Sequence, residues 1–308
     1  MNQSLFIGIE GGATRTTGVV VDEGLEILAQ RSAGPTNLHA VAEPAAREAM
    51  REILASLCRS VGTRWERVGA TAFCLAGIRT DADRADWRRI ASDLAPPWPL
   101  VLGHDADASL AAGSANRTGV LVVSGTGSLV FGRRADGAER FVGGRGPILG
   151  DDGSGFDIAR RGLRAAVRAA DGRAEPTRLR QLLPERLGLG GLEDLAAWVR
   201  PYAKDRVAGA APIVFQAAEA GDRVAERILQ SAAAELAGGA AALVEALWPG
   251  GDWPRRVVLA GGVLRSQQGF RSRLAAELTR RLGRVECVLP DCPGAVGAAR
   301  IARDALPR

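Results

Sequence analysis

The sequence has 308 residues, a formal net charge of +5, 46% hydrophobic and 24% charged residues. This composition is ordinary for a globular protein, and no run approaches the ~20 apolar residues of a membrane span. The arginines are spread along the chain and form no basic stripe interleaved with aromatic residues. We therefore expect no membrane partner and no nucleic-acid partner. No basic segment followed by an apolar core precedes the first predicted strand, so the sequence predicts a cytoplasmic protein.

The first third of the chain alternates strands and helices. Apolar residues that alternate or cluster predict the strands, and apolar residues spaced by three and four predict the helices. The expected elements are three strands within 5–31, a helix at 43–60, a strand at 68–76, a helix at 79–94 and a short strand at 99–103.

The second part of the chain again begins with predicted strands and continues with long predicted helices. The expected elements are strands at 119–124, 128–133 and 139–143, helices at 154–170, 175–187, 191–200, 203–220 and 222–248, a strand at 257–259, and helices at 269–283 and 294–305. Two halves that open alike indicate an internal duplication and an α/β fold with mixed sheets. We expect a lobe at 1–115, a lobe at 116–293 and a C-terminal helix at 294–308 that packs back on the first lobe.

Two short turns rich in Gly, Ser and Thr stand at equivalent places in the two halves. Each follows a run of apolar residues and leads into another, at 10–14 and at 124–128. Turns with little side-chain bulk let backbone N–H groups and hydroxyls close on an anion, most often phosphate. The pair of turns indicates a nucleotide bound between two lobes, although each turn alone could be a plain hairpin connection.

The four cysteines, Cys58, Cys74, Cys287 and Cys292, form no Cys-x-x-Cys pair, and the chain has only 2 histidines. A structural zinc site is not expected from this set.

Several short motifs together resemble the sugar kinase, Hsp70 and actin superfamily. Within it the chain is most similar to the N-acetylglucosamine kinases, which share a family with the BadF/BadG/BcrA/BcrD ATPases. The motifs are Ile7 to Thr14, Gly34-Pro35-Thr36-Asn37, Leu75-Ala76-Gly77, His104-Asp105-Ala106, Ser124 to Ser128, Gly143 to Gly146, Leu149 to Gly155 and Ala260 to Val263. The resemblance implies a two-lobed actin-like ATPase fold built from duplicated ribonuclease H-like domains.

The resemblance implies ATP and Mg²⁺ as the cofactors. The residues that it places on the nucleotide are Gly11, Gly12 and Thr14 in the first turn, Ser124, Gly125, Thr126 and Gly127 in the second, and Gly261 and Gly262 beside the adenosine. Glu10 stands where the family usually has Asp, and its carboxylate would hold Mg²⁺ directly or through water.

Asp105 is the expected catalytic base. A carboxylate at the end of a strand can take the proton of a sugar hydroxyl as that hydroxyl attacks the γ-phosphate. The resemblance favours Asp105 over Asp107 and Asp22, because the family's base precedes Ala at this point. The structural alternative is that Asp105 is the N-cap of a helix that starts at Ala106.

The resemblance implies that a sugar contacts Asn37, Ala76, Gly77, Gly144, Arg145 and Asp151. Asp151 could instead cap the following helix. Arg145 departs from the pattern, because the N-acetylglucosamine kinases commonly have Trp there. An Arg suits a carboxylate or phosphate, so glucosamine and N-acetylmuramate stay open beside N-acetylglucosamine. The structural alternative is that Arg145 points outward to solvent or pairs with Asp151 or Asp152.

The expected function is an ATP-dependent kinase that phosphorylates an amino sugar, most simply N-acetylglucosamine, and a homodimer is the family expectation. The alternative is an ATPase that activates a dehydratase or a benzoyl-CoA reductase-type system and holds an iron–sulfur cluster through cysteines. No cysteine lies between Cys74 and Cys287, which favours the kinase.

Overall fold

The computed structural model describes residues 4–12, 14–94, 98–200 and 202–306. The chain divides into two compact units, and each contains one five-stranded sheet. The first unit comprises Met1–Arg117 and Pro290–Arg308, and the second comprises Thr118–Leu289. The α/β class with two mixed sheets agrees with the expectation from the sequence.

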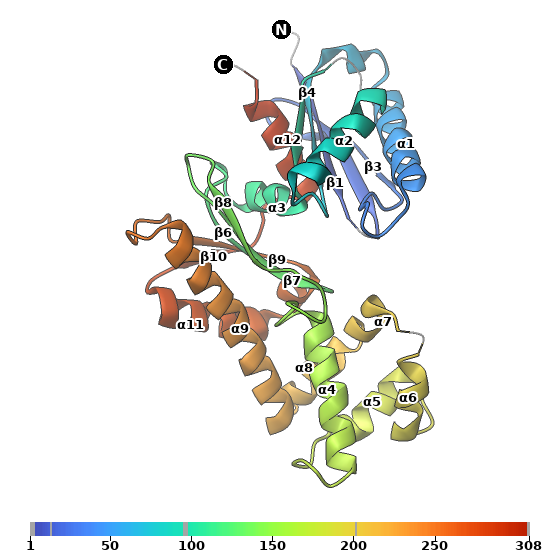
Figure 1. Ribbon diagram of the computed structural model, residues 1–308, viewed down its shortest axis with the longest axis vertical. Coiled ribbons are helices and arrows are strands. Elements are labelled where there is room, and N and C mark those ends of the chain that lie inside the picture. The colour runs from blue at the N-terminus through green and yellow to red at the C-terminus, as the bar shows by residue number, and fades with distance from the viewer. Residues whose placement is uncertain (1–3, 13, 95–97, 201, 307–308) are drawn as a thin grey trace. The chain divides into compact units, whose positions relative to one another are not determined.

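The sheet of the first unit has the strand order β3-β2-β1-β4-β5, and Figure 1 labels its strands β1, β3 and β4. Strands β1, β2 and β3 are antiparallel neighbours, and β1, β4 and β5 run parallel. The elements of this unit are β1 (Leu5–Gly11), β2 (Thr16–Val21), β3 (Ile27–Ala33), β4 (Val68–Leu75), β5 (Leu100–Gly103), α1 (Glu43–Val61), η1 (Gly62–Arg67), α2 (Asp81–Leu94), α3 (Asp105–Gly113) and α12 (Gly294–Asp304).

Alternation along β1 gives this sheet two buried faces. Ile7 and Ile9 pack in the same apolar cluster as α1 and α2, whereas Phe6 packs with α3 and α12 on the opposite face. Both faces are covered because successive strand residues point to opposite sides. Helix α12 lies directly on β1, and a Cβ at Gly8 would overlap its backbone at Ala295 and Ala299.

The second unit repeats the same topology. Its sheet has the order β10-β9-β6-β7-β8, so β6 corresponds to β1 and β9 to β4. The elements of this unit are β6 (Gly119–Ser124), β7 (Ser128–Arg133), β8 (Glu139–Gly143), β9 (Arg256–Ala260), β10 (Glu286–Val288), α4 (Gly155–Ala170), α5 (Leu179–Leu187), η2 (Leu192–Asp194), α6 (Leu195–Trp198), α7 (Lys204–Ala208), α8 (Ala211–Glu219), α9 (Arg223–Leu247), α10 (Gly262–Ser266) and α11 (Gln268–Leu282). The matching order supports the duplication that the sequence indicates.

Some predicted elements differ from the structure. The helix expected at 203–220 is two helices, α7 and α8, because Pro212 stands in the first turn of α8 and cannot donate a backbone hydrogen bond to a preceding turn. The helix expected at 191–200 is reduced to η2 and α6, and α5 begins only at Leu179. The short elements η1, α10 and β10 are too brief to give a periodic pattern and are not predicted.

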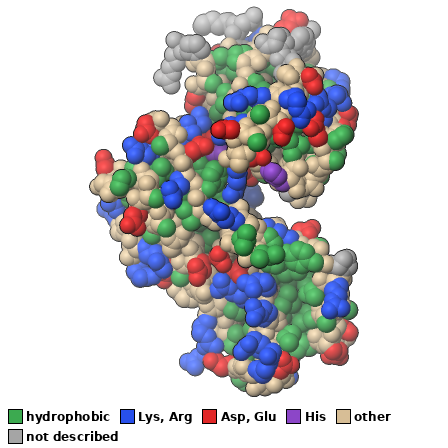
Figure 2. Space-filling view, in the orientation of Figure 1, with side chains coloured by type: hydrophobic (Ala, Val, Ile, Leu, Met, Phe, Trp, Pro, Cys, Tyr) green, Lys and Arg blue, Asp and Glu red, His purple; other side chains and the backbone are tan. Residues whose placement is uncertain are grey.

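Charged side chains of both signs are scattered over the visible surface, and basic ones gather over α4 (Figure 2). Two of the α4 arginines, Arg160 and Arg161, pair with the buried Asp157 of the same helix. Among the described residues, no helix is both long and apolar enough to cross a bilayer.

Candidate functional site

The carboxyl ends of β1, β4 and β5 meet at one edge of the first sheet. The strand register places Glu10 opposite Cys74, and Cys74 opposite Gly103. Asp105 follows Gly103 by two residues, so it stands at the same edge as Glu10. Ligands of parallel α/β sheets bind at this edge. The structure therefore brings the expected base and the expected metal ligand to one end of the first unit.

Asp105 is the first residue of α3, and the N-cap is His104. Nδ1 of His104 accepts a hydrogen bond from the Asp107 backbone N–H at 3.0 Å. Since His104 fills the capping role, the alternative reading of Asp105 as the N-cap is wrong. Asp105 Oδ1 accepts a hydrogen bond from the backbone N–H of Ala106 at 3.0 Å.

Burial raises the pKa of Asp105 above its ordinary value, against the opposing effect of the neighbouring His104. A carboxylate poorly solvated by water is a stronger base than an exposed one. The geometry and the pKa thus both suit the proton-accepting role expected from the sequence.

The first glycine turn connects β1 to β2 and is tied to two other segments. The turn is closed by a hydrogen bond from Gly12 N to Arg15 O at 3.0 Å. Ala76 N donates to Gly11 O at 2.7 Å, and Thr36 N donates to Gly12 O at 3.2 Å. A Cβ at Gly11 would overlap Thr36 Oγ1. The segments around 36 and 76 therefore depend on glycine at position 11. Thr14, the remaining expected residue of this turn, is exposed just before β2.

Asn37 and Gly77, both expected on the sugar, are neighbours in the structure. Gly77 has φ +92°, and a Cβ there would lie 2.5 Å from Asn37 Oδ1. Ala76 precedes Gly77 directly, so these three residues form one small group. His39 contacts this group, because its Nε2 lies 3.2 Å from Gly77 O. The same nitrogen lies 3.1 Å from Asp83 Oδ1.

The second glycine turn, 124–128, is closed by a hydrogen bond from Gly125 N to Gly127 O at 2.9 Å. The start of α4 binds this turn, since Gly155 N donates to Gly125 O at 2.8 Å. Ser124 Oγ donates to Gly153 O at 2.7 Å, which fixes the turn to the loop before α4. The turn is therefore a rigid part of the second unit.

Gly261 packs directly on this turn. Its φ is +95°, a conformation that favours glycine, and a Cβ would overlap the backbone at Ser124 and Gly125. The next residue, Gly262, faces open space. The Ala260-Gly261-Gly262 connection thus joins the expected adenosine site to the expected phosphate turn.

A cavity of about 350 Å³ opens beside these glycines. Gly125, Thr126 and Gly262, three of the expected nucleotide residues, line it. The other lining residues come from the start of α4, from α7 and α8, and from the end of α10: Gly155, Asp205, Ala208, Gly209, Ala211, Pro212, Phe215, Val263, Ser266 and Gln267. Its volume falls in the range of small-molecule sites. The α7 and α8 residues are missed by the sequence analysis, because a single expected helix at 203–220 hides the bend at Gly209.

Asp151 lies 5% exposed behind the turn. Its Oδ1 accepts from Ser128 N at 3.3 Å, and its Oδ2 lies 2.6 Å from Nζ of Lys204. Lys204 is also missed by the sequence analysis, although it is the sole lysine of the chain. The helix N-cap after Asp151 is Ser154, whose hydroxyl accepts from Asp157 N at 3.1 Å, so Asp151 does not cap α4.

Gly144 and Arg145 lie in the loop after β8. The loop is closed by hydrogen bonds from Gly144 N to Gly150 O at 2.8 Å and from Gly150 N to Gly146 O at 3.0 Å. The side chain of Arg145 is exposed and forms no ion pair with Asp151 or Asp152 within the described ranges. The loop also exposes Ile148, at 92%, and Leu149. Arg145 is therefore not held by a carboxylate of its own loop.

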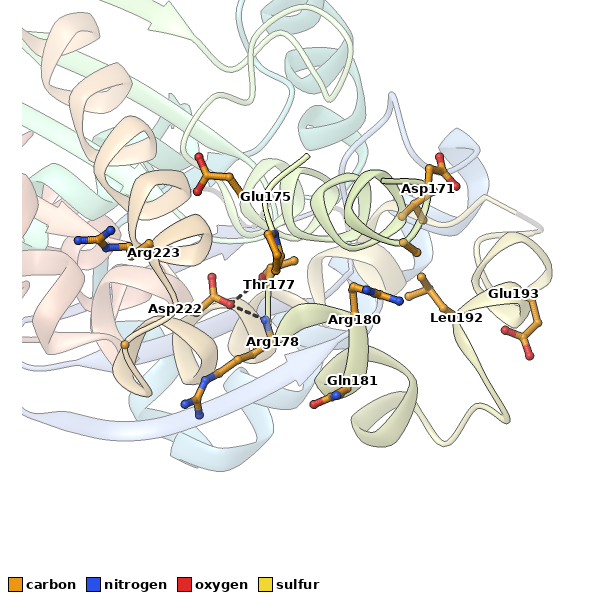
Figure 3. A pocket seen from close by; sticks show the side chains of 14 residues that line it. Asp171, Glu175, Thr177, Arg178, Arg180, Gln181, Leu192, Glu193, Asp222 and Arg223 are labelled. Atoms are coloured by element: carbon orange, nitrogen blue, oxygen red, sulfur yellow. Dashed lines mark hydrogen bonds between the residues drawn. The ribbon is translucent and has the colours of Figure 1, made fainter. Parts of the chain in front are cut away.

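A larger hollow of about 1000 Å³ lies at the far end of α4 (Figure 3). Its most buried acid, Asp222, accepts hydrogen bonds from Thr177 Oγ1 and Arg178 N and caps α9. These bonds hold the chain before α5 against α9. No expected site residue lines this hollow, so we assign the candidate nucleotide site to the smaller cavity.

Residues 7–302 match the model of the BadF/BadG/BcrA/BcrD ATPase family. An N-acetylmuramic acid/N-acetylglucosamine kinase of Clostridium acetobutylicum is 30% identical over 96% of this chain and 97% of its own length. An N-acetyl-D-glucosamine kinase of Dictyostelium discoideum is 28% identical over 98% of both chains.

A crystal structure of a candidate N-acetylglucosamine kinase from Chromobacterium violaceum superimposes with a TM-score of 0.73. It is 26% identical and covers 97% of this chain and 99% of its own. The family match spans nearly the whole chain, and the solved structure shares the two-unit α/β fold. The chain therefore belongs to the BadF/BadG/BcrA/BcrD ATPase family.

Proposed function

We propose that this protein is an ATP-dependent kinase of N-acetylated amino sugars, with N-acetylglucosamine and N-acetylmuramate as the candidate substrates. The observation that carries the proposal is the placement of Asp105, a desolvated carboxylate at the strand edge beside Glu10 and the first glycine turn. The named activities of the relatives from Clostridium acetobutylicum and Dictyostelium discoideum support the same class of substrate.

In this proposal the second unit binds the nucleotide. The base and ribose occupy the 350 Å³ cavity, where Gly262 leaves room for them. The phosphates contact the turn at 124–128, whose closed geometry presents N–H groups and the Thr126 hydroxyl. The first unit has its own candidate phosphate-binding turn at Gly11, Gly12 and Thr14.

The first unit supplies the base. The Asp105 carboxylate takes the proton from a sugar hydroxyl, whose oxygen attacks the γ-phosphorus. The bond between that phosphorus and the bridging oxygen breaks, and ADP leaves. Asn37, Ala76 and Gly77 are the candidate sugar-binding residues of this unit, and Gly144 and Arg145 are those of the second unit. Short polar side chains of this kind pair with ring hydroxyls.

Glu10 fits a magnesium ion by the chemistry of its donor atoms, since Mg²⁺ prefers carboxylate oxygen and keeps several waters. The half-buried carboxylate stands beside the first glycine turn, at the edge that also carries Asp105. When bound, Mg²⁺ neutralises charge on the phosphate oxygens. The role of Glu10 is to fix the ion at this edge.

The cysteines support a kinase rather than an iron–sulfur activator. Cys74 is fully buried, and burial raises its pKa well above the ordinary value. A thiolate is the form that holds iron, and such a site disfavours it.

The test is ADP release from ATP against a panel of N-acetylglucosamine, N-acetylmuramate, glucosamine and glucose, with the Asp105→Asn variant as the blank. We expect sugar-dependent ADP release with at least one N-acetyl sugar. Release that no sugar stimulates would contradict the proposal. Light scattering of the same sample measures the homodimer that the family resemblance predicts.

A further inference from the structure

Lys204 is the only lysine of a sequence that holds 40 Lys and Arg residues in total. It is the first residue of the short helix α7. Its side chain is 32% exposed and reaches the buried Asp151, with Nζ 2.6 Å from Oδ2. Lys204 therefore carries the only side-chain ammonium group in the sequence.

The ammonium group of Lys204 lies against the second glycine turn. A Cβ built on Gly127 would stand 2.9 Å from Lys204 Nζ and 3.0 Å from Asp151 Oδ1. Any side chain at position 127 would thus press on the Lys204–Asp151 pair. The absence of a side chain at Gly127 is what gives the ammonium access to the turn.

The turn itself has donors that the protein does not use. Gly125 N donates to Gly127 O, and Ser128 N donates to Asp151. Among the residues described by the structure, the N–H groups of Thr126 and Gly127 have no protein acceptor. Two unpaired backbone donors and an ammonium group at the same turn form the kind of concave site that binds a phosphate.

A lysine suits this position better than an arginine. The ammonium group is compact and acts as a point charge, whereas a guanidinium is a planar fork that needs more room. The space between Gly127 and Asp151 is narrow, as the two distances to the Gly127 Cβ position show.

We propose that Lys204 binds the terminal phosphate of the nucleoside triphosphate, and that Asp151 holds its ammonium group beside the turn until the nucleotide arrives. This inference rests on the proposed function and assigns a residue to its nucleotide site. The ammonium neutralises charge on the phosphate oxygens, and Asp151 keeps one hydrogen bond, from Ser128 N, when Lys204 turns to the phosphate.

Calorimetry with AMP, ADP and ATP separates this role from a structural one. Lys204→Met should weaken ATP binding roughly 10–150-fold, the range of a hydrogen bond to a charged group, and leave AMP binding within about twofold. Arg206→Met is the matched control, because Arg206 lies on the same helix and stacks over Trp198, 5.0 Å from its ring centroid. This control should bind all three nucleotides as the parent protein does.

Removal of Lys204 leaves a buried carboxylate without its partner, which can destabilise the fold. The double variant Lys204→Met with Asp151→Asn removes that charge and should show the same selective loss of ATP. Equal loss of AMP and ATP in the double variant would overturn the proposal. A parent protein that binds no nucleotide would overturn the proposed function as well.

The sole lysine also permits a covalent test. An acyl phosphate of ATP transfers its acyl group to an amine at the phosphate site and releases ATP. We expect mass spectrometry to find the acyl group on Lys204, and excess unmodified ATP to prevent the labelling. Labelling that excess ATP does not reduce would place Lys204 outside the nucleotide site.

Discussion

The carboxylate of Glu10 occupies the space that a side chain at Gly294 would need. Gly294 is the first residue of α12, so the carboxylate faces the N-terminal end of that helix. Unpaired N–H groups and the helix dipole at such an end favour a negative charge. Glu10 thereby lies against an element that begins 284 residues further along the sequence.

Gly294→Ala should push Glu10 out of its position. We expect kcat/KM for sugar phosphorylation to fall about tenfold or more, since small displacements of a site residue are costly, and the half-saturating Mg²⁺ concentration to rise. Gly269→Ala is the control, because Gly269 is also near a helix start and faces open space. Equal activity of the two variants at every Mg²⁺ concentration would show that the place of Glu10 does not matter.

Asp105→Asn should lower kcat by roughly 10²-fold or more and leave ATP binding nearly intact, because the amide cannot accept the proton. Near-normal turnover would remove Asp105 from the mechanism. Rapid-quench measurement of phosphorylated sugar separates this step from product release.

The same variant should be more stable than the parent protein at neutral pH. Burial raises the pKa of Asp105 in the folded state, so the folded protein binds more protons than the unfolded chain between the two pKa values. Stability therefore falls as the pH rises through this interval. Asn lacks the penalty of the buried charge, so its advantage in melting temperature should be greatest above the folded pKa of Asp105 and disappear below about pH 4, the unfolded pKa. An advantage that is constant with pH would contradict this origin.

Gly261→Ala and Gly262→Ala should have different effects although the residues are adjacent. Alanine at Gly261 would meet the backbone of Ser124 and adopt φ near +95°, which costs on the order of 1–3 kcal/mol from the backbone alone. We expect a lower melting temperature. The methyl group of an alanine at position 262 would contact no other atom of the protein, and it would lie beside the cavity. The melting temperature should therefore equal that of the parent protein, whereas the affinity for adenosine should fall. Thermal unfolding and adenosine titration measure both.

Arg145→Trp should shift preference toward the neutral sugar if the guanidinium binds the lactyl carboxylate of N-acetylmuramate. The expected cost for the acidic sugar is about 1.5–3 kcal/mol, as for a hydrogen bond to a charged group. The ratio of kcat/KM for N-acetylmuramate over N-acetylglucosamine is the measurement. Arg140→Trp, an exposed change on β8, should leave the ratio unchanged. An unchanged ratio in Arg145→Trp would assign Arg145 to the scaffold.

Much of the fold could be predicted from the sequence, because its signals are local. Ile7 and Ile9 point to one face of the first strand and Phe6 points to the other, which indicates a sheet buried on both faces. The glycine turns mark where the strands end. The break at Gly209 is missed because apolar residues continue at helical spacing across 203–220, although Pro212 in the first turn of α8 is a local signal for a new helix.

The missed site residue, Lys204, shows the same limit. Its partner Asp151 is 53 residues earlier in the chain, and no periodicity connects them. The one feature of the sequence that distinguishes Lys204 is that it is the sole lysine among 40 Lys and Arg residues. The Glu10–Gly294 contact is similarly invisible in a local pattern.

The placement of α12 on β1 has a consequence for how the chain is made. The first unit needs residues from both sides of the second, so a ribosome finishes Thr118–Leu289 before α12 exists. Until then the face of β1 around Gly8 has no cover from Ala295 and Ala299. The second unit can therefore fold during synthesis, whereas the first unit can complete its core only after α12 has been synthesised.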